Sequence, residues 1–361
     1  MIFGILREQQ DPRVAMVPAT AKKMIAAGHE IWVEKGAGVS AHYPDSEYEE
    51  SGASLRSAKE ILSGADVFVS HHPLDDATTA QLPSGKIQIS MFSLRTTPET
   101  KEKFEQSDQW GFSMDMIPRT TIAQSMDVLS STASLAGYQA VLTAAKLLPG
   151  YFPMLMTAAG TIPPAKVLVL GAGVAGLQAI ATARRLGAKV EAFDVRSAVK
   201  EEVQSLGAKF VEVEGATEDQ GAGGYAVTQT EEYQQRQKEL IHDHASKSDV
   251  IITTANIPGR KAPLLIEQRT VEAMRAGSVI VDMASATGGN CAVTKDGEIV
   301  SHQGVSVVGD SVLASEMSRD SSLLFANNVW NFVQYVFKDG KDQIDFDNEI
   351  VSATFLGKRP S

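Results

Sequence analysis

Three glycines and one aspartate have the spacing of a dinucleotide-binding motif. Gly171, Gly173 and Gly176 form the sequence G-x-G-x-x-G, and Asp194 follows roughly 20 residues later. The first glycine permits a tight turn, the second lets the backbone approach a pyrophosphate, and the third lets a helix pack closely against a strand. The phosphates would lie at the helix N-terminus, where unpaired N–H groups and the helix dipole favour negative charge.

The residues around these glycines predict the strand, helix and strand that the motif requires. Val167–Leu170 is a continuous apolar run, typical of a parallel strand that is buried on both faces. Apolar residues at helical spacing predict a helix at Leu177–Leu186, and Val190–Phe193 predicts the second strand. Asp194 would bind the adenosine ribose and repel a 2′-phosphate, so the motif favours NAD(H) over NADP(H). Arg196 could hold a 2′-phosphate, although a solvated arginine is the favoured interpretation.

Composition excludes several classes of protein. The chain has 361 residues, which predicts two domains, and its net charge of −11 argues against a nucleic-acid surface. The single cysteine, Cys291, rules out a disulfide framework and indicates a reducing compartment. Prolines and glycines interrupt the most apolar region, Leu147–Ala165, so we expect no direct insertion into a membrane. No cluster of residues has the spacing of metal ligands, so we expect no metal site.

Strands alternate with helices along the chain, which predicts parallel sheets. We expect an α/β fold with two Rossmann-like domains separated by a cleft. Residues 1–130 plus 313–361 would form the N-terminal domain, completed by the C-terminal segment, and residues 131–312 the NAD(H)-binding domain. The expected strands, besides those of the motif, are Ile2–Leu6, Glu30–Glu34, Val67–Ser70, Ile87–Met91, Phe210–Val213, Val250–Thr253, Val279–Asp282, Val305–Val308 and, near the end of the chain, Ile350–Phe355.

Two polar segments are candidates for the remaining site residues. Residues 214–229 are rich in glycine and acidic residues, which is typical either of a solvated loop or of a hinged flap with Tyr225 as its lid. Arg119, Gln124, Asp127 and Ser130 have intervals that let one loop surround a small polar group. The alternative for this second segment is an interdomain linker with structural hydrogen bonds.

No residue stands out as the proton acceptor that oxidation of an alcohol or an amino acid needs. The histidines His71 and His72 end an expected strand of the first domain, so one of them could serve this purpose. The motifs alone therefore do not decide which reaction the protein catalyses.

The loop around Arg119 resembles the Arg-Gln-Asp loop of proton-translocating nicotinamide nucleotide transhydrogenases. The similarity is to their NAD(H)-binding component, domain I of the alpha subunit, and it covers nearly the whole chain. The other matching segments are Asp11–Pro18, Met156–Ala165, Gly171–Ala183, Gly223–Ala226, Thr253–Gly259, Gly288–Cys291 and Leu324–Val329. The segment Asp310–Ser318 departs from the family's usual residues.

The resemblance implies a role for each matching residue. Arg119, Gln124, Asp127 and Ser130 would hold the nicotinamide end of NADH and set its ring against a second nicotinamide. The pyrophosphate would be held by Gly171, Ala172, Gly173 and Val174, with Gly176. The adenosine ribose would be bound by Asp194, Val195 and Arg196. The mobile loop would include Gly224 and Tyr225, and the adenine side would be lined by Asn256. Hydride transfer between two nicotinamides moves no proton at the reacting atoms, so orientation would be the main catalytic contribution.

The resemblance also implies partners. NADP(H) would bind to a partner domain, separate subunits would span the membrane, and the chain would form a homodimer. The reaction would be reversible hydride transfer between NADH and NADP⁺, coupled to proton translocation. The protein would be cytoplasmic, held at the cytoplasmic face of the inner membrane through its partners.

Two alternatives remain. Alanine dehydrogenases are related, and their carboxylate-binding arginine matches Arg13, but their substrate-binding lysine and catalytic histidine would fall near His71 and Ser93. This chain has neither that lysine nor that catalytic histidine at the matching positions, so oxidation of an amino acid should fail. The second alternative is a regulatory subunit that binds NADH and catalyses nothing.

Overall fold

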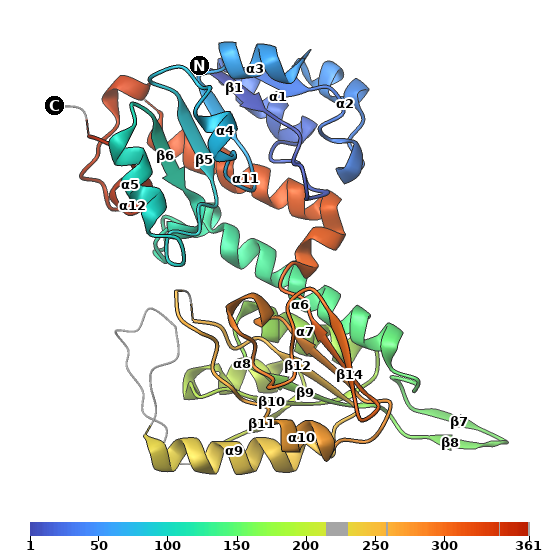
Figure 1. The fold of residues 1–361 in the computed structure, drawn as a ribbon. Helices are drawn as coiled ribbons and strands as arrows, with labels where there is room; N and C mark the ends of the chain where they lie inside the picture. The colour runs from blue at the N-terminus through green and yellow to red at the C-terminus, as the bar shows by residue number, and fades with distance from the viewer. Residues whose placement is uncertain (214–229, 258, 339, 360–361) are drawn as a thin grey trace. The chain divides into compact units, whose positions relative to one another are not determined.

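The computed structural model describes residues 1–213, 230–257, 259–338 and 340–359. The chain divides into two compact units, one of Met1–Thr132 with Ser315–Ser361 and one of Ala133–Ala314 (Figure 1). The expected domain boundaries, after residues 130 and 312, stay a prediction. Both units contain a seven-stranded sheet with helices on its two faces, so the predicted α/β class with two Rossmann-like sheets is confirmed.

The sheet of the first unit has the order β3-β2-β1-β4-β5-β6-β16, and only β16 runs antiparallel to its neighbour. Its strands are β1 (Ile2–Ile5), β2 (Glu30–Glu34), β3 (Ser54–Arg56), β4 (Val67–Val69), β5 (Ile87–Ser90), β6 (Trp110–Ser113) and β16 (Phe355–Leu356). Its helices are α1 (Pro18–Ala26), α2 (Asp45–Ser51), α3 (Ala58–Gly64), α4 (Asp76–Thr79), α5 (Glu99–Gln106), α11 (Ser318–Val336) and α12 (Glu349–Thr354). The long helix α11 packs with α1 in the main core of this unit.

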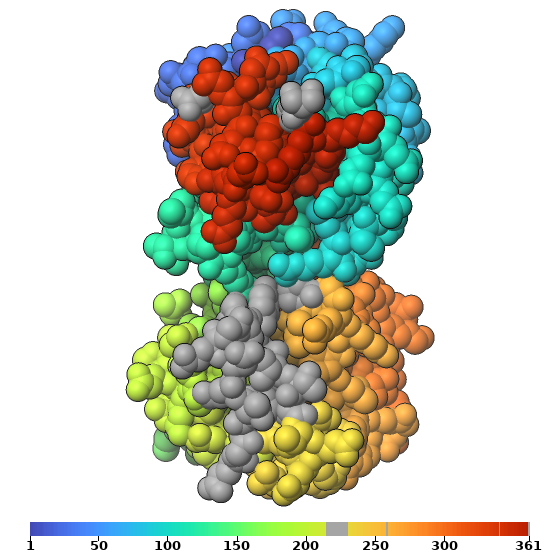
Figure 2. Space-filling model, turned by 90° about the vertical axis from the view of Figure 1, so that its left-hand side faces the viewer, coloured from blue at the N-terminus to red at the C-terminus, as the bar shows by residue number. Residues whose placement is uncertain are grey.

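The end of the chain differs from its prediction. Most of the expected strand Ile350–Phe355 is the helix α12, and only Phe355–Leu356 pairs with β6. Asn348 begins the helix because its side chain accepts hydrogen bonds from the N–H groups of Ile350 and Val351. The helix buries one apolar face, so the same apolar residues serve a helix rather than a strand. Figure 2 shows these last residues, in red, beside the cyan segments of the first unit.

The sheet of the second unit has the order β11-β10-β9-β12-β13-β15-β14, with β14 antiparallel at one edge. Its strands are β9 (Lys166–Leu170), β10 (Lys189–Phe193), β11 (Lys209–Val211), β12 (Val250–Thr253), β13 (Val279–Asp282), β14 (Ile299–His302) and β15 (Val305–Gly309). Its helices are α7 (Val174–Arg185), α8 (Lys200–Ser205), α9 (Glu231–Ala245), α10 (Gln268–Glu272) and most of α6 (Val128–Leu147). An exposed hairpin of β7 (Leu155–Thr157) and β8 (Gly160–Ile162) completes the unit.

Alternate residues of β9 enter two different cores, which explains its continuous apolar sequence. Val167 and Val169 pack with α6, α7 and α8, whereas Leu168 and Leu170 pack with α9 and α10. Helices therefore cover both faces of the sheet (Figure 1), as expected for a parallel sheet.

Both sheets reverse their strand order between the first and fourth strands along the chain. These points lie between β1 and β4 in the first unit and between β9 and β12 in the second. In open α/β sheets, ligands bind outside the carboxyl ends of the strands at such a point. No helix in the described ranges is both long and apolar enough to span a membrane.

Candidate functional site

The glycine loop follows β9 at the reversal point of the second sheet. Gly171 has a φ of +101°, and a Cβ there would lie 2.5 Å from Oγ1 of Thr254. A Cβ at Gly176 would lie 1.8 Å from the carbonyl oxygen of Gly171. Only glycine therefore permits the turn and the close approach of α7 to the strand.

Gly173 differs from these two glycines because, apart from its chain neighbours, no atom of the described residues lies within 4 Å of the position that its Cβ would occupy. It is the N-cap residue of α7, and no side chain caps the helix there. The N–H groups of the first helical turn have no partner within the helix. The space beside Gly173 and the uncapped helix end together suit the pyrophosphate of a dinucleotide.

Asp194 lies at the end of β10 and contacts the glycine loop directly. Its Oδ2 accepts a hydrogen bond of 2.7 Å from the N–H of Ala172. The guanidinium of Arg196 donates to both carboxylate oxygens, with Nε–Oδ1 at 2.9 Å and Nη2–Oδ2 at 2.8 Å. The hydrogen bond to Asp194 raises the pKa of Arg196 above its ordinary value. The interpretation of Arg196 as a solvated arginine is therefore wrong, because this ion pair holds it.

The segment after β12 completes this side of the site. The hydroxyl of Thr254 donates to the carbonyl of Gly171 at 3.1 Å, which joins the segment to the glycine loop. Asn256 is exposed, and its Oδ1 accepts a hydrogen bond from Thr287 at 3.2 Å. Val195, which follows Asp194 in the chain, is half-buried against the core that contains α9.

A buried polar pair behind this segment escaped the sequence analysis. Asp282 ends β13, is fully buried, and accepts hydrogen bonds from Thr253, Thr294 and the N–H of Asn290. Asn290 in turn bonds both the N–H and the carbonyl of Ala255. The pair therefore fixes the loop that carries Asn256. The only sign of this pair in the sequence was the segment Gly288–Cys291, which matches the transhydrogenase family. Its contact with Ala255 could not be predicted, because the two residues are far apart in the chain.

The loop before α6 belongs to the first unit and carries the other predicted residues. Arg119 and Gln124 are exposed, and Asp127 and Ser130 are half-buried. Asp127 accepts hydrogen bonds from the N–H of Ser130 at 3.0 Å and from its hydroxyl at 2.5 Å. Asp127 therefore also acts as the N-cap of α6, in agreement with the structural alternative for this segment.

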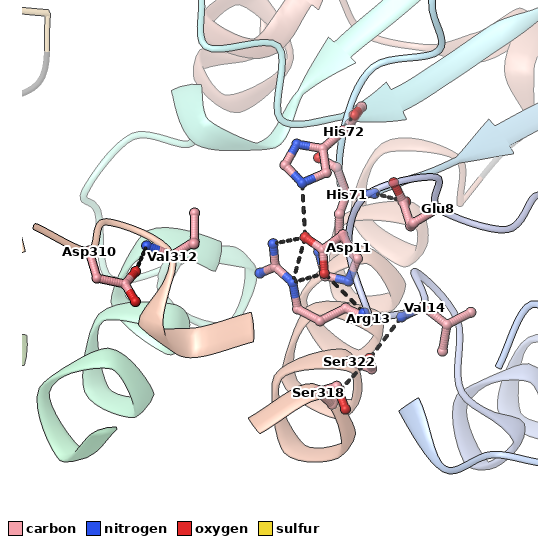
Figure 3. A network of polar contacts seen from close by, with 11 residues as sticks. Glu8, Asp11, Arg13, Val14, His71, His72, Asp310, Val312, Ser318 and Ser322 are labelled. Atoms are coloured by element: carbon pink, nitrogen blue, oxygen red, sulfur yellow. Dashed lines mark hydrogen bonds and ion pairs between the residues drawn. The ribbon is translucent and has the colours of Figure 1, made fainter. Parts of the chain in front are cut away.

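A second polar cluster lies at the reversal point of the first sheet (Figure 3). The Nε of Arg13 is 2.9 Å from Oδ1 of Asp11, and Nη2 is 2.5 Å from Oδ2. His72 bonds the same carboxylate at 2.9 Å. Burial raises the pKa of Asp11, but the hydrogen bonds from Arg13 and His72 outweigh it and hold that pKa well below its usual range.

The neighbouring His71 is fully buried, and neither of its ring nitrogens has a hydrogen-bond partner in the part of the chain that the structure describes. Its ring packs against Phe325 with 3.9 Å between centroids, and its backbone N–H donates to Glu8. Burial lowers the pKa of His71 well below its ordinary value. A side chain so enclosed is poorly placed to accept a proton from a substrate.

The predicted residues thus form two groups. The second unit brings together the glycine loop, Asp194, Val195, Arg196 and Asn256, and the first unit holds Arg119, Gln124, Asp127 and Ser130 in one loop. Gly224 and Tyr225 lie outside the described residues. Within the described ranges, no group of three or more acidic, histidine or cysteine side chains is placed to hold a metal ion.

The fold and the glycine loop define an α/β protein of the Rossmann type. The family models "Alanine dehydrogenase/PNT, N-terminal domain" and "Alanine dehydrogenase/PNT, C-terminal domain" match residues 4–136 and 140–359. The chain therefore belongs to the alanine dehydrogenase/PNT family.

Individual relatives show which branch of the family is nearer. The chain is 43% identical over 358 residues to an alpha-subunit chain of the NAD(P) transhydrogenase of Rhodospirillum rubrum, covering 96% of this chain and 93% of the relative. A crystal structure of transhydrogenase from Sinorhizobium meliloti matches with a TM-score of 0.90 and 41% identity, covering 99% of this chain and 98% of that one. A structure of L-alanine dehydrogenase shares the fold, with a TM-score of 0.79, 23% identity and coverage of 94% and 91%. The predicted resemblance, with alanine dehydrogenases as more distant relatives, is confirmed.

Proposed function

We propose that the chain is the NAD(H)-binding component of a proton-translocating transhydrogenase. The observation that carries the proposal is the uncapped start of α7, with open space beside Gly173 and Asp194 held against the same loop. The similarity to transhydrogenase alpha subunits supports the same function.

In this proposal the second unit holds the adenosine and pyrophosphate parts of NADH. The stretch Gly171–Val174 holds the pyrophosphate through the N–H groups of Gly173 and Val174, since those of Gly171 and Ala172 already donate to Phe193 and Asp194. The carboxylate of Asp194 accepts hydrogen bonds from the ribose. Because Arg196 is engaged by Asp194, its guanidinium is directed away from a 2′-phosphate role. The site therefore prefers NAD(H) to NADP(H).

Arg119, Gln124, Asp127 and Ser130 act on the nicotinamide end by orientation. Bound NADH supplies the hydride, and NADP⁺ on a partner domain accepts it. Because no proton moves at the reacting atoms, the residues of this chain need to position rings rather than transfer protons. Proton translocation belongs to membrane-spanning partner subunits, which hold this chain, as a homodimer, at the cytoplasmic face of the inner membrane.

The same geometry disfavours alanine dehydrogenase activity. The arginine that would bind a substrate carboxylate, Arg13, already has a carboxylate partner in Asp11. Of the two candidate histidines, His71 is enclosed against Phe325, and His72 bonds the same Asp11. A regulatory subunit without catalysis remains the other alternative, and the intact set of Arg119, Gln124 and Asp127 counts against it.

Three parallel reactions test the proposal. The first contains the chain, NADH and an NADP⁺-loaded partner component, the second omits the partner, and the third contains NADH, pyruvate and ammonia. Oxidation of NADH in the first reaction alone supports the transhydrogenase. Oxidation with pyruvate and ammonia would indicate an alanine dehydrogenase, and binding of NADH without oxidation in any reaction would indicate a regulatory subunit.

A further inference from the structure

Two asparagines of α11 converge on one carbonyl of the loop that carries Gln124. Nδ2 of Asn328 lies 2.8 Å from the carbonyl oxygen of Ser125, and Nδ2 of Asn331 lies 3.0 Å from the same oxygen. The two asparagines are three residues apart, so they project from one face of the helix. They reach a segment that is 203 residues distant from Asn328 in the chain. All of these residues belong to the first unit.

The chemistry of this contact requires donors on α11. A carbonyl oxygen only accepts hydrogen bonds, so the atom that faces it in each amide must be the nitrogen. Asn328 is only 6% exposed, and its buried Oδ1 has no hydrogen-bond partner among the described residues. An unsatisfied buried oxygen lowers stability, so an apolar side chain would suit the core better at this position. The amide's structural contribution is therefore the bond to the loop.

The backbone of this loop is otherwise held at its two flanks. Ala123 and Met126 are buried in the same core as α11, and the N–H of Met126 bonds the carbonyl of Ala123. Between them, the side chains of Gln124 and Ser125 are exposed. The two asparagines thus restrain the exposed part of the turn from which Gln124 projects.

We propose that Asn328 and Asn331 are positioning residues, which hold the Gln124 turn in the orientation that hydride transfer requires. The inference rests on the proposed function, because it assigns Gln124 to the nicotinamide. Neither asparagine needs to touch the nucleotide. Their loss should therefore slow the transfer step and leave NADH binding, which is dominated by the second unit, nearly unchanged.

The half-buried Asn331 gives the sharper variants, because substitution of the buried Asn328 could disrupt the core. Asn331→Ala removes one donor, and Asn331→Asp places a second oxygen near the carbonyl and adds repulsion. Asn327→Ala is the matched control, since Asn327 bonds Thr20 of α1 and not the loop. The readouts are the single-turnover rate with the NADP⁺-loaded partner component, the Kd for NADH, and amide exchange of the peptide 118–127.

We expect Asn331→Ala to lower the transfer rate about fivefold and Asn331→Asp about twentyfold, the effect of losing one hydrogen bond and then adding repulsion. The Kd for NADH should change by less than about twofold, amide exchange in 118–127 should rise in the same order, and Asn327→Ala should match the unmodified chain. Equal transfer rates in the unmodified chain and in both Asn331 variants would overturn this inference alone. Equal losses in rate and affinity would also overturn it. Absence of transfer by the unmodified chain would instead overturn the proposed function, and this inference with it.

Discussion

The carboxylate of Asp127 caps α6, and in the proposed function it also orients the nicotinamide; these two tasks place different demands on its chemistry. As the N-cap of α6 it needs only an acceptor oxygen, which it directs to the N–H of Ser130. As a residue that orients a nicotinamide ring it would also use its charge and its second oxygen. An asparagine retains the first property and loses the charge, so the two tasks can be separated at this residue.

We therefore predict different outcomes for two variants of Asp127. Asp127→Ala should lower the free energy of unfolding by about 1 kcal/mol, because the helix loses its cap, and should also slow hydride transfer. Asp127→Asn should restore the stability, because asparagine caps helices as well as aspartate does, but transfer should stay slow. Chemical denaturation and the transfer rate check this pair. A rate that recovers together with stability would mean that Asp127 acts only as a cap.

His71 provides a prediction on pH. Its pKa in the folded chain lies well below the ordinary value because burial and the nearby Arg13 disfavour the charged ring. Below about pH 6.5 the unfolded chain binds a proton that the folded chain does not, so stability falls as the pH falls, by up to about 1.4 kcal/mol per pH unit. The half-buried His29, whose pKa is also lowered by desolvation, adds in the same direction.

The neighbouring pair of His72 and Asp11 affects stability at pH values that differ from those at which His71 acts. The raised pKa of His72 gives a contribution that is present in acid and is lost as the pH rises through the folded-state value. The lowered pKa of Asp11 gives a stabilising contribution that is lost only below about pH 4. His71→Phe should therefore reduce the loss of stability between pH 6 and 5, measured by urea unfolding. An unchanged slope in the variant would refute this account of His71.

At the scale of single elements, the glycine loop before α7 meets two separate requirements, close packing of the helix and space for a ligand. One glycine lets the helix approach the strand, and another leaves space for a ligand. The structure separates these requirements because an added methyl group would meet the backbone at Gly176 and nothing at Gly173.

Alanine substitution should therefore have opposite effects at these two glycines. Gly176→Ala should destabilise the fold by several kcal/mol, on the order of 3, since its Cβ would overlap the Gly171 carbonyl. Gly173→Ala should change stability by less than about 1 kcal/mol and weaken NADH binding about tenfold or more, since its methyl group would enter the pyrophosphate space. Thermal unfolding and NADH titration distinguish them. Normal NADH affinity in Gly173→Ala would contradict the placement of the pyrophosphate.

Sequence patterns predicted the elements best where burial was complete. The apolar runs of β9, β12 and β13 indicated central strands, and each is buried along most of its length. The short strand β3 and the edge strand β14 went unpredicted because neither is fully buried and their sequences are partly polar. The strand β6 was also missed, since Gly111 and Ser113 interrupt its apolar pattern.

At the scale of the whole molecule, the two units share the order of their first five strands, but their reversal points differ in chemistry. The second unit has a glycine loop and an uncapped helix there, whereas the first has the ion pair of Arg13 and Asp11. The glycine loop was predictable because its residues are close in sequence. The bond of His72 to Asp11 and the two bonds of α11 to Ser125 were not predictable, because they join residues that are 61, 203 and 206 positions apart.

The central claim is direct hydride transfer from NADH held by this chain to NADP⁺ held by a partner. The most direct measurement uses NADH with deuterium at both C4 positions, the NADP⁺-loaded partner component and ordinary water, followed by mass spectrometry of the NADPH formed. Direct transfer predicts about one deuterium in each NADPH, because the hydride passes between the rings without exchange with solvent. NADPH without deuterium would contradict the account, because the two electrons would then pass through an intermediate carrier whose hydrogen exchanges with water, and this account contains no such carrier.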